Sequence, residues 1–184
     1  MTAASPPFVN FGWRAADFRL ADTRGKVWSP EQLRGPKGLL LMFICNHCNY
    51  VLAVVDKLAR QGRELHDLGF GVAAICSNDA QAYPEDSYER MGAFARQHHL
   101  PFPYLHDVNQ TTARAYGAVC TPDFFGFNSE LKLQYRGRLD DSGASANPAA
   151  RRELYEAMRQ VAATGQGPRE QVPAIGCSIK WKAA

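Results

Sequence analysis

Two cysteines separated by two residues are the part of this sequence best suited to chemistry. Cys45 and Cys48 enclose Asn46 and His47. Thiols at this spacing can close a small disulfide, and as thiolates they are also soft ligands for zinc or copper. The pair by itself therefore leaves redox chemistry and metal binding open.

The segments on either side of the pair favour redox chemistry. Apolar residues run without interruption over 38–44, which predicts a strand buried on both faces, and they recur at helical spacing over 49–68. The tetrapeptide is therefore expected to join a strand to the amino end of a helix, whose dipole stabilises a thiolate. Cys45 is the expected attacking thiol, and Cys48, one turn further into the helix, is the expected resolving thiol. A protonated His47 would stabilise the Cys45 thiolate further.

A second motif lies far along the chain, where Cys120 and Thr121 precede Pro122 and Asp123. A proline that opens a β-like segment cannot donate to a strand ladder, so it belongs at a strand start and is a candidate for a cis peptide bond. Cys120 and Asp123 are candidate accessory residues on either side of it. Asp79 and Asp123 are the candidates for assisting Cys48.

The remaining pattern predicts an α/β fold with a central mixed sheet flanked by helices. A strand, helix and strand over 38–76 predict a parallel crossover. The other expected helices follow Ser29 and span 88–95, 107–116 and 154–161, and Asp107 is the expected cap of the third of these four. The other expected strands are an N-terminal hairpin over 17–28, an edge strand over 100–105 and an antiparallel hairpin over 123–136. One domain over 1–184 is expected, with an N-terminal extension over 1–35 and a C-terminal tail over 165–184 that packs in part on the body.

The composition excludes several classes of protein. With 184 residues, 46% hydrophobic and 21% charged, the chain suits one globular domain, and a net charge of +3 with dispersed Lys and Arg gives no support for nucleic-acid binding. Neither a signal peptide nor a membrane span is evident, so a cytoplasmic location and no membrane partner are expected. Five cysteines do not suggest a secreted framework. Cys76 is expected as a core residue and Cys177 as a packed residue of the tail.

Motifs along nearly the whole chain resemble a known family. They are Phe43 to Cys48, Ser77 to Asp79, Tyr83 to Ser87, Phe102 to Leu105, Tyr116 to Phe125, Arg138 to Ser142 and Gly176 to Lys182. Together they resemble the thioredoxin superfamily, and within it the redoxin branch related to alkyl hydroperoxide reductase and thiol-specific antioxidant proteins. The resemblance implies a thioredoxin fold.

The resemblance also implies a mechanism. Pro122 would be cis and lie against the redox pair, and the Thr121 backbone would pair with an extended substrate segment while Cys45 attacks its disulfide. The expected activity is that of a thiol-disulfide oxidoreductase with no organic cofactor, acting on a protein or small-molecule disulfide together with a dithiol reductant. A monomer or weak homodimer is expected. Two departures from the family pattern are Asn49, where proline is usual, and Leu39, where thioredoxins carry a buried acid.

Two other functions stay open. If the protein were a peroxiredoxin-like peroxidase, Cys48 would correspond to the peroxidatic cysteine. Cys45 then stands where that family has threonine, and Thr121 where it has arginine. A metal-binding module would use Cys45, Cys48 and His47, with Cys120 or His99 as a distant ligand. Thiol cycling with a dithiol reductant, or retention of metal after dialysis, separates the redox protein from the metal protein.

Overall fold

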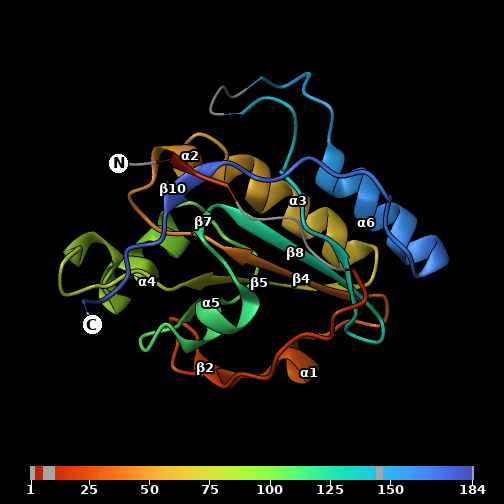
Figure 1. Ribbon diagram of the computed structural model, residues 1–184. Helices are drawn as coiled ribbons and strands as arrows, with labels where there is room; N and C mark the ends of the chain where they lie inside the picture. Colours follow the sequence, from red (N-terminus) through yellow and green to blue (C-terminus); the bar gives the residue numbers. More distant parts are fainter. Residues whose placement is uncertain (1–2, 6–10, 144–146, 184) are drawn as a thin grey trace.

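The computed structural model describes residues 3–5, 11–143 and 147–183. Its central strands follow the order β6, β5, β4, β8 and β9, and β5, β4 and β8 lie side by side in Figure 1. These strands span Tyr104–His106, Phe70–Cys76, Gly38–Phe43, Asp123–Asn128 and Leu133–Tyr135, in that order. β8 runs antiparallel to β4 and β9, whereas β6 runs parallel to β5, so the sheet is mixed as predicted.

β5 runs in the same direction as β4. The Lys37 amide before β4 donates to the Gly69 carbonyl before β5, and the Ile44 amide after β4 donates to the Ile75 carbonyl, both at 3.0 Å. The two strands therefore start together and end together, which is the arrangement of parallel neighbours. This confirms the predicted crossover and places Cys45, the residue after Ile44, at the end of a central strand.

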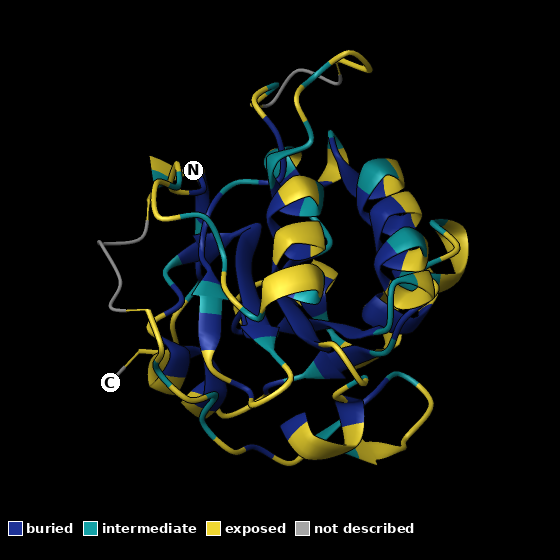
Figure 2. Cartoon of the chain, turned by 90° about the vertical axis from the view of Figure 1, so that its right-hand side faces the viewer, coloured by how far each residue is buried: buried dark blue, intermediate teal, exposed yellow. Residues whose placement is uncertain are grey.

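Both faces of the sheet are covered, and every residue of β4 is buried. Leu40 and Met42 pack in one cluster with residues of α3 (Val55–Asp67), α4 (Tyr88–Gln97) and α6 (Glu153–Thr164). Leu39 and Leu41 point to the other face and pack with α1 (Pro30–Leu33) and α5 (Thr111–Tyr116). Figure 2 shows the strands dark blue between outer layers whose solvent-facing sides are yellow. Burial on both faces explains the uninterrupted apolar run.

The helical pattern over 49–68 forms two helices instead of the single helix expected. α2 (Asn49–Leu52) is one turn long, and α3 begins at Val55. Val54 between them has φ −124° and ψ 2°, which departs from helical geometry. Apolar periodicity could not reveal this break, because the buried positions keep a helical spacing on both sides of it.

The helix expected from Asp107 begins instead at Thr111. Gln110 precedes it in the left-handed region with φ 60°, so the first turn cannot extend back to Asp107. The predicted capping role is nevertheless observed, since the Asp107 carboxylate accepts hydrogen bonds from the amides of Thr112 and Ala113 at 3.2 and 2.9 Å. Other observed elements are β2 (Leu20–Ala21) and β3 (Val27–Trp28), which form the predicted hairpin, and the short 3-10 helix η1 (Pro84–Asp86).

A small second sheet joins the two ends of the chain to the body. It has the order β1 (Ala3–Ala4), β10 (Gly176–Ser178) and β7 (Cys120–Thr121), with antiparallel neighbours. The tail therefore packs on the domain, as expected, through β10. The Thr121–Pro122 peptide bond between β7 and β8 is cis, as the sequence predicted. None of the helices in the described part of the chain has the length and hydrophobicity needed to span a bilayer.

Candidate functional site

The CxxC segment lies between the end of β4 and the start of α2. Cys48 is the residue that immediately precedes α2, at its N-cap position, and Cys45 stands three residues before it. The expectation that Cys45 would occupy the helix start, with Cys48 a turn inside, is therefore wrong, because the helix start lies three residues further along the chain, at Cys48. The reason is that Asn46 and His47 form a bend, not the first helical residues. Both cysteines are buried, with exposed fractions of 1% and 0%.

Thr121 and the cis peptide bond lie directly against the two thiols. The Cys45 sulfur is 3.4 Å from Thr121 Oγ1, and the Cys48 sulfur is 3.1 Å from the Thr121 carbonyl oxygen. Pro122, which follows, lines an apolar surface groove together with Tyr50 and Phe124. The structure thus brings the Thr121–Pro122 segment to Cys45 and Cys48, as the family resemblance implied.

A third cysteine belongs to the same cluster. The Cys177 sulfur lies 2.7 Å from the Cys48 sulfur, and Cys177 is 4% exposed. Cys177 lies far from the other cysteines in the sequence, so its place beside Cys48 could not be predicted from spacing. The arrangement puts Cys48 in contact with thiols on both sides.

The contact between Cys45 and Cys48 shifts their pKa values in opposite directions and favours the thiolate on Cys48. A hydrogen bond from the Cys45 thiol lowers the pKa of Cys48, with help from contacts with Cys177 and Thr121 and against the effect of burial. The same hydrogen bond, together with burial and the charge of Asp86, raises the pKa of Cys45. The thiolate therefore forms at the start of α2, where the helix amides point.

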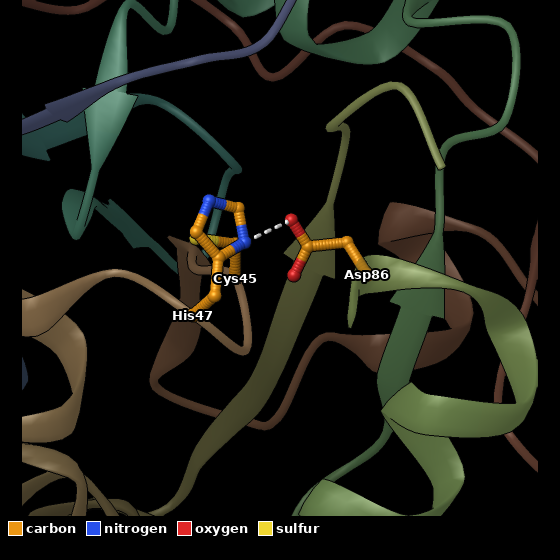
Figure 3. Close-up of side chains that lie close together, drawn as sticks. All are labelled: Cys45, His47 and Asp86. Carbon is orange, nitrogen blue, oxygen red and sulfur yellow. Dashed lines mark ion pairs between the residues drawn. The ribbon is translucent and has the colours of Figure 1, made fainter. Parts of the chain in front are cut away.

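His47 is held by an acid that sequence reasoning did not assign to the site. Its Nδ1 lies 2.8 Å from Asp86 Oδ2, an ion pair when the imidazole is protonated, and Figure 3 shows this contact with Cys45 beside the ring. The His47 ring stacks on Tyr83 at a centroid distance of 5.6 Å. Asp86 is fully buried and also accepts from the Asn46 amide and from Asn78 Nδ2, each at 2.7 Å.

Asp86 had a weak signal in the sequence. It belongs to one of the motifs that carry the family resemblance, but it lies 38 residues after Cys48, at the end of η1, and only the fold brings it to the thiols. The acids considered for assisting Cys48 have other contacts. Asp79 accepts from the Gln81 amide at 3.1 Å, and the fully buried Asp123 pairs with Arg136 at 3.0 Å.

The two other cysteines are buried and have raised pKa values. Burial raises the pKa of Cys76 to about 12 and that of Cys120 still further. The Cys120 sulfur faces the Pro122 carbonyl at 3.7 Å on the strand beside the site. Neither thiol ionises near neutral pH, whereas the pKa of Cys48 is lowered.

One group of side chains has the composition of a metal site. Ligand atoms of Cys45, His47 and Asp86 lie within 4.8 Å of one another. The Asp86 carboxylate accepts hydrogen bonds from the Asn46 amide and from Asn78 Nδ2, and its Oδ2 lies 2.8 Å from His47 Nδ1, a buried atom with no hydrogen-bond partner in the part of the chain that the structure describes. Among the described residues, neither Cys120 nor His99 belongs to this group.

The backbone edge expected to receive substrate is occupied by the chain itself. Cys177 of β10 pairs with Thr121 of β7 in an antiparallel register, and the Ile179 amide donates to the Val119 carbonyl at 3.0 Å. The Thr121 backbone is therefore not a free edge for an extended substrate in this conformation, contrary to what the family resemblance implied. The tail takes that place because Gly176 lets its backbone approach the Thr121 carbonyl closely.

Gly176 offers a direct test of how tightly β10 is seated. A Cβ atom there would lie 2.0 Å from the Thr121 carbonyl oxygen, so Gly176→Ala is expected to displace β10, to cost about 1–3 kcal/mol of unfolding free energy and to speed alkylation of Cys48 and Cys177. Urea denaturation and iodoacetamide trapping measure both effects. Gly92→Ala in α4 is the control, since its Cβ would have no contact closer than 3.4 Å. Equal alkylation rates in the Gly176 variant and the parent would contradict this account of the tail.

Comparison with known proteins agrees with this geometry. A crystal structure of an uncharacterized conserved protein from Geobacillus kaustophilus is 40% identical, with a TM-score of 0.94, covering 100% of this chain and 98% of that one. A hypothetical protein from Sinorhizobium meliloti 1021 is 38% identical, with a TM-score of 0.91 and coverage of 98% and 99%.

A more distant structure shares the fold. The thioredoxin domain of a thiol-disulfide oxidoreductase from Bacteroides vulgatus is 13% identical, with a TM-score of 0.65, covering 84% of this chain and 99% of that one. A search of curated proteins gave no match. The sequence matches the AhpC/TSA family over residues 11–136, more than half of the chain, and that match agrees with a thioredoxin fold that carries clustered thiols. The chain therefore belongs to the AhpC/TSA family and has a thioredoxin fold.

Proposed function

We propose that this protein is a thiol-disulfide oxidoreductase in which Cys45 and Cys48 cycle between dithiol and disulfide. The observation that carries the proposal is the position of both thiols against Thr121 at the cis peptide bond, with the Cys45 sulfur 3.4 Å from Thr121 Oγ1 and the Cys48 sulfur 3.1 Å from the Thr121 carbonyl oxygen. Membership of the AhpC/TSA family and the fold shared with thiol-disulfide oxidoreductases support a thiol-redox role. The proposed partners are a disulfide substrate and a dithiol reductant.

In the proposed reaction Cys45 attacks first. The Cys45 thiolate bonds to one sulfur of the substrate disulfide and expels the other as a thiolate. Cys48 then attacks the Cys45 sulfur, closes the Cys45–Cys48 disulfide and releases the second substrate thiolate. The one proton that Cys45 and Cys48 share passes to one released sulfur and the other sulfur leaves as a thiolate, so the substrate is reduced by two electrons and the protein is oxidised by two.

The surroundings of the two thiols support this order of attack. Cys48 is enclosed by Thr121, by Cys177 and by the start of α2. Cys45 instead lies next to His47, which is half-buried and lines a surface groove with Asn46 and Pro84. Because Cys45 is itself only 1% exposed, a substrate must displace part of this cover to reach it.

Attack by Cys45 requires that the shared proton leave it. Transfer along the hydrogen bond to Cys48 supplies the Cys45 thiolate without a separate base. A protonated His47 favours charge on Cys45, whereas Asp86 opposes it by raising the pKa of Cys45. The pair of His47 and Asp86 thus sets how much of the thiolate resides on the attacking sulfur.

Removing the charge of Asp86 is expected to make Cys45 more acidic. In a Cys48→Ser/Cys177→Ser background, which removes the other two thiols of the site, Asp86→Asn should move the titration of Cys45 to lower pH and speed its alkylation at neutral pH several-fold. His47→Ala in the same background should move the titration the other way. Thiolate absorbance against pH measures both. A shift to higher pH in Asp86→Asn would contradict the proposed role of this acid.

The proposed function is tested by measuring two activities on the same purified, reduced protein. Turnover of a small disulfide with a dithiol reductant is compared with turnover of hydrogen peroxide under the same conditions. We expect the disulfide activity to be the larger, because the threonine and arginine that a peroxiredoxin-like site needs are replaced by Cys45 and Thr121. Fast peroxide turnover with negligible disulfide reduction would overturn the proposal in favour of a peroxidase.

A further inference from the structure

Cys177 is held at the site by a strand fixed on both edges. On one side Cys177 pairs with Thr121, and on the other it pairs with Ala3 of β1. Gly176 allows the close approach to the Thr121 carbonyl that this register requires. The Cys177 sulfur is therefore placed by a central strand of the small sheet.

The chain that follows β10 is also tethered. The Lys180 amide donates to Asn78 Oδ1 at 2.9 Å, and the Lys180 carbonyl accepts from the Asp79 amide and from Gln110 Nε2, each at 2.8 Å. These bonds attach the tail to the loop after β5 and to the start of α5. Removal of Cys177 from the site would require several of these contacts to break together.

The contact between Cys177 and Cys48 is close enough for a bond. Their sulfurs lie 2.7 Å apart, and both residues are at least 96% buried. A disulfide bond of about 2.05 Å is reached by a sulfur movement of less than about 1 Å. Cys48 also contacts Cys45, so it stands between two possible sulfur partners.

We propose that Cys177 is a third redox thiol. It exchanges with the Cys45–Cys48 disulfide, so that a Cys48–Cys177 disulfide replaces it. The Cys177 thiolate attacks the Cys48 sulfur, the Cys48–Cys177 bond forms, and Cys45 leaves as a thiolate. Cys177 attacks as a thiolate and Cys45 leaves as a thiolate, so one S–S bond replaces another, the negative charge passes from Cys177 to Cys45, and no outside oxidant is consumed. This inference rests on the proposed redox function of Cys45 and Cys48.

The protonation of Cys177 follows the state of Cys48. Burial, followed by the hydrogen bond and the charge of the reduced Cys48, raises the pKa of Cys177 to about 11. When Cys48 is in a disulfide, its thiolate no longer exists and that contribution disappears. Cys177 is therefore more readily ionised in the oxidised site, which is the state in which its attack is useful.

The exchange has a consequence for substrates. It frees Cys45 as a thiolate beside His47 while Cys48 is held by the tail, so Cys45 can form a mixed disulfide that Cys48 does not at once resolve. The Cys48–Cys177 bond also ties β10 to the start of α2. The tail thus becomes part of the redox cycle.

Disulfide mapping of serine variants tests this inference. Cys45→Ser, treated with one equivalent of diamide and quenched in acid with alkylation, is expected to lose two free thiols and to yield one peptide pair joined through Cys48 and Cys177. Cys45→Ser/Cys177→Ser should yield no intramolecular link. Cys45→Ser/Cys120→Ser is the matched control and should keep the link, because Cys120 faces Pro122 instead of Cys48. Near-ultraviolet circular dichroism of each variant before oxidation checks that the fold is retained.

The outcomes separate this inference from the proposed function. If wild-type protein forms the Cys45–Cys48 disulfide and turns over disulfides, but folded Cys45→Ser gives no Cys48–Cys177 link, the inference is wrong and the proposed function stands. A second outcome is that the Cys48–Cys177 link forms in Cys45→Ser while wild-type protein never joins Cys45 to Cys48. Cys177 is then a redox partner of Cys48, but the proposed exchange with the Cys45–Cys48 disulfide is wrong and the proposed function fails. Recovery of both links in oxidised wild-type protein, with loss of the second in Cys177→Ser, supports the full exchange.

Discussion

Replacing Cys45 with serine is expected to abolish disulfide reduction, with a loss of turnover of at least about a thousandfold. The reason is that a hydroxyl in place of the attacking sulfur cannot form the mixed disulfide. Cys48→Ser should lose multiple turnover to a similar degree, because the mixed disulfide on Cys45 is then not resolved. Turnover of oxidised glutathione, with dithiothreitol as reductant, measures both losses. Cys120→Ser is the control and is expected to stay active, since its thiol contacts the Pro122 carbonyl and has a raised pKa.

The two variants should differ in what they trap. Cys48→Ser is expected to accumulate a mixed disulfide between substrate and Cys45, visible as the added mass of one glutathione, whereas Cys45→Ser should accumulate none at position 45 and little elsewhere, because Cys48 is enclosed by Thr121 and Cys177. Accumulation on Cys48 in the Cys45 variant, without accumulation on Cys45 in the other, would reverse the assigned roles of attacking and resolving thiol.

The largest expected effect on stability is at Asp123. Asp123 and Arg136 form an ion pair with side chains that are 0% and 4% exposed. Asp123→Ala leaves the guanidinium buried without its partner, so a loss of about 3–5 kcal/mol in unfolding free energy is expected at neutral pH. Urea denaturation followed by circular dichroism measures it. Glu130→Ala, which removes an exposed carboxylate paired with Lys132, is the control and should change stability by about 0.5 kcal/mol or less.

This prediction also decides between two roles for Asp123. The sequence made it a candidate for assisting Cys48, whereas its buried contact with Arg136 points to a structural role. If the role is structural, Asp123→Ala/Arg136→Met should recover most of the lost stability, because no buried charge is left unpaired. Near-normal stability of Asp123→Ala combined with a specific loss of disulfide turnover would instead support the accessory role.

Much of the fold was predictable because local signals agreed with the tertiary arrangement. The run 38–44 is apolar at every position because β4 is covered on both faces, and Ser29 caps α1 with its side chain accepting from the Gln32 amide. Gly117 closes α5 in the left-handed region, which glycine adopts readily. The break at Val54 and the start of α5 at Thr111 were not predictable, since they depend on backbone angles that apolar spacing does not specify.

The site was predictable only where its residues are neighbours in sequence or carry a turn signal. Cys45 and Cys48 are close in the chain, and Thr121–Pro122 is marked by the proline. Asp86 and Cys177 reach the same thiols from η1 and from β10, and their places depend on long-range pairing that one sequence does not encode locally. The same limit explains why Thr121 was expected to offer a free edge, although β10 covers it.

The most direct test of the central claim is a redox titration of the purified protein in buffers of defined glutathione ratio. After acid quenching and alkylation, peptide mapping gives the state of each cysteine. We predict a reversible loss of two thiols with a link between Cys45 and Cys48, which dithiothreitol restores, while Cys76 and Cys120 stay reduced. A protein whose Cys45 and Cys48 stay unlinked under oxidising ratios, or whose thiols are protected by metal that dialysis does not remove, would contradict the account.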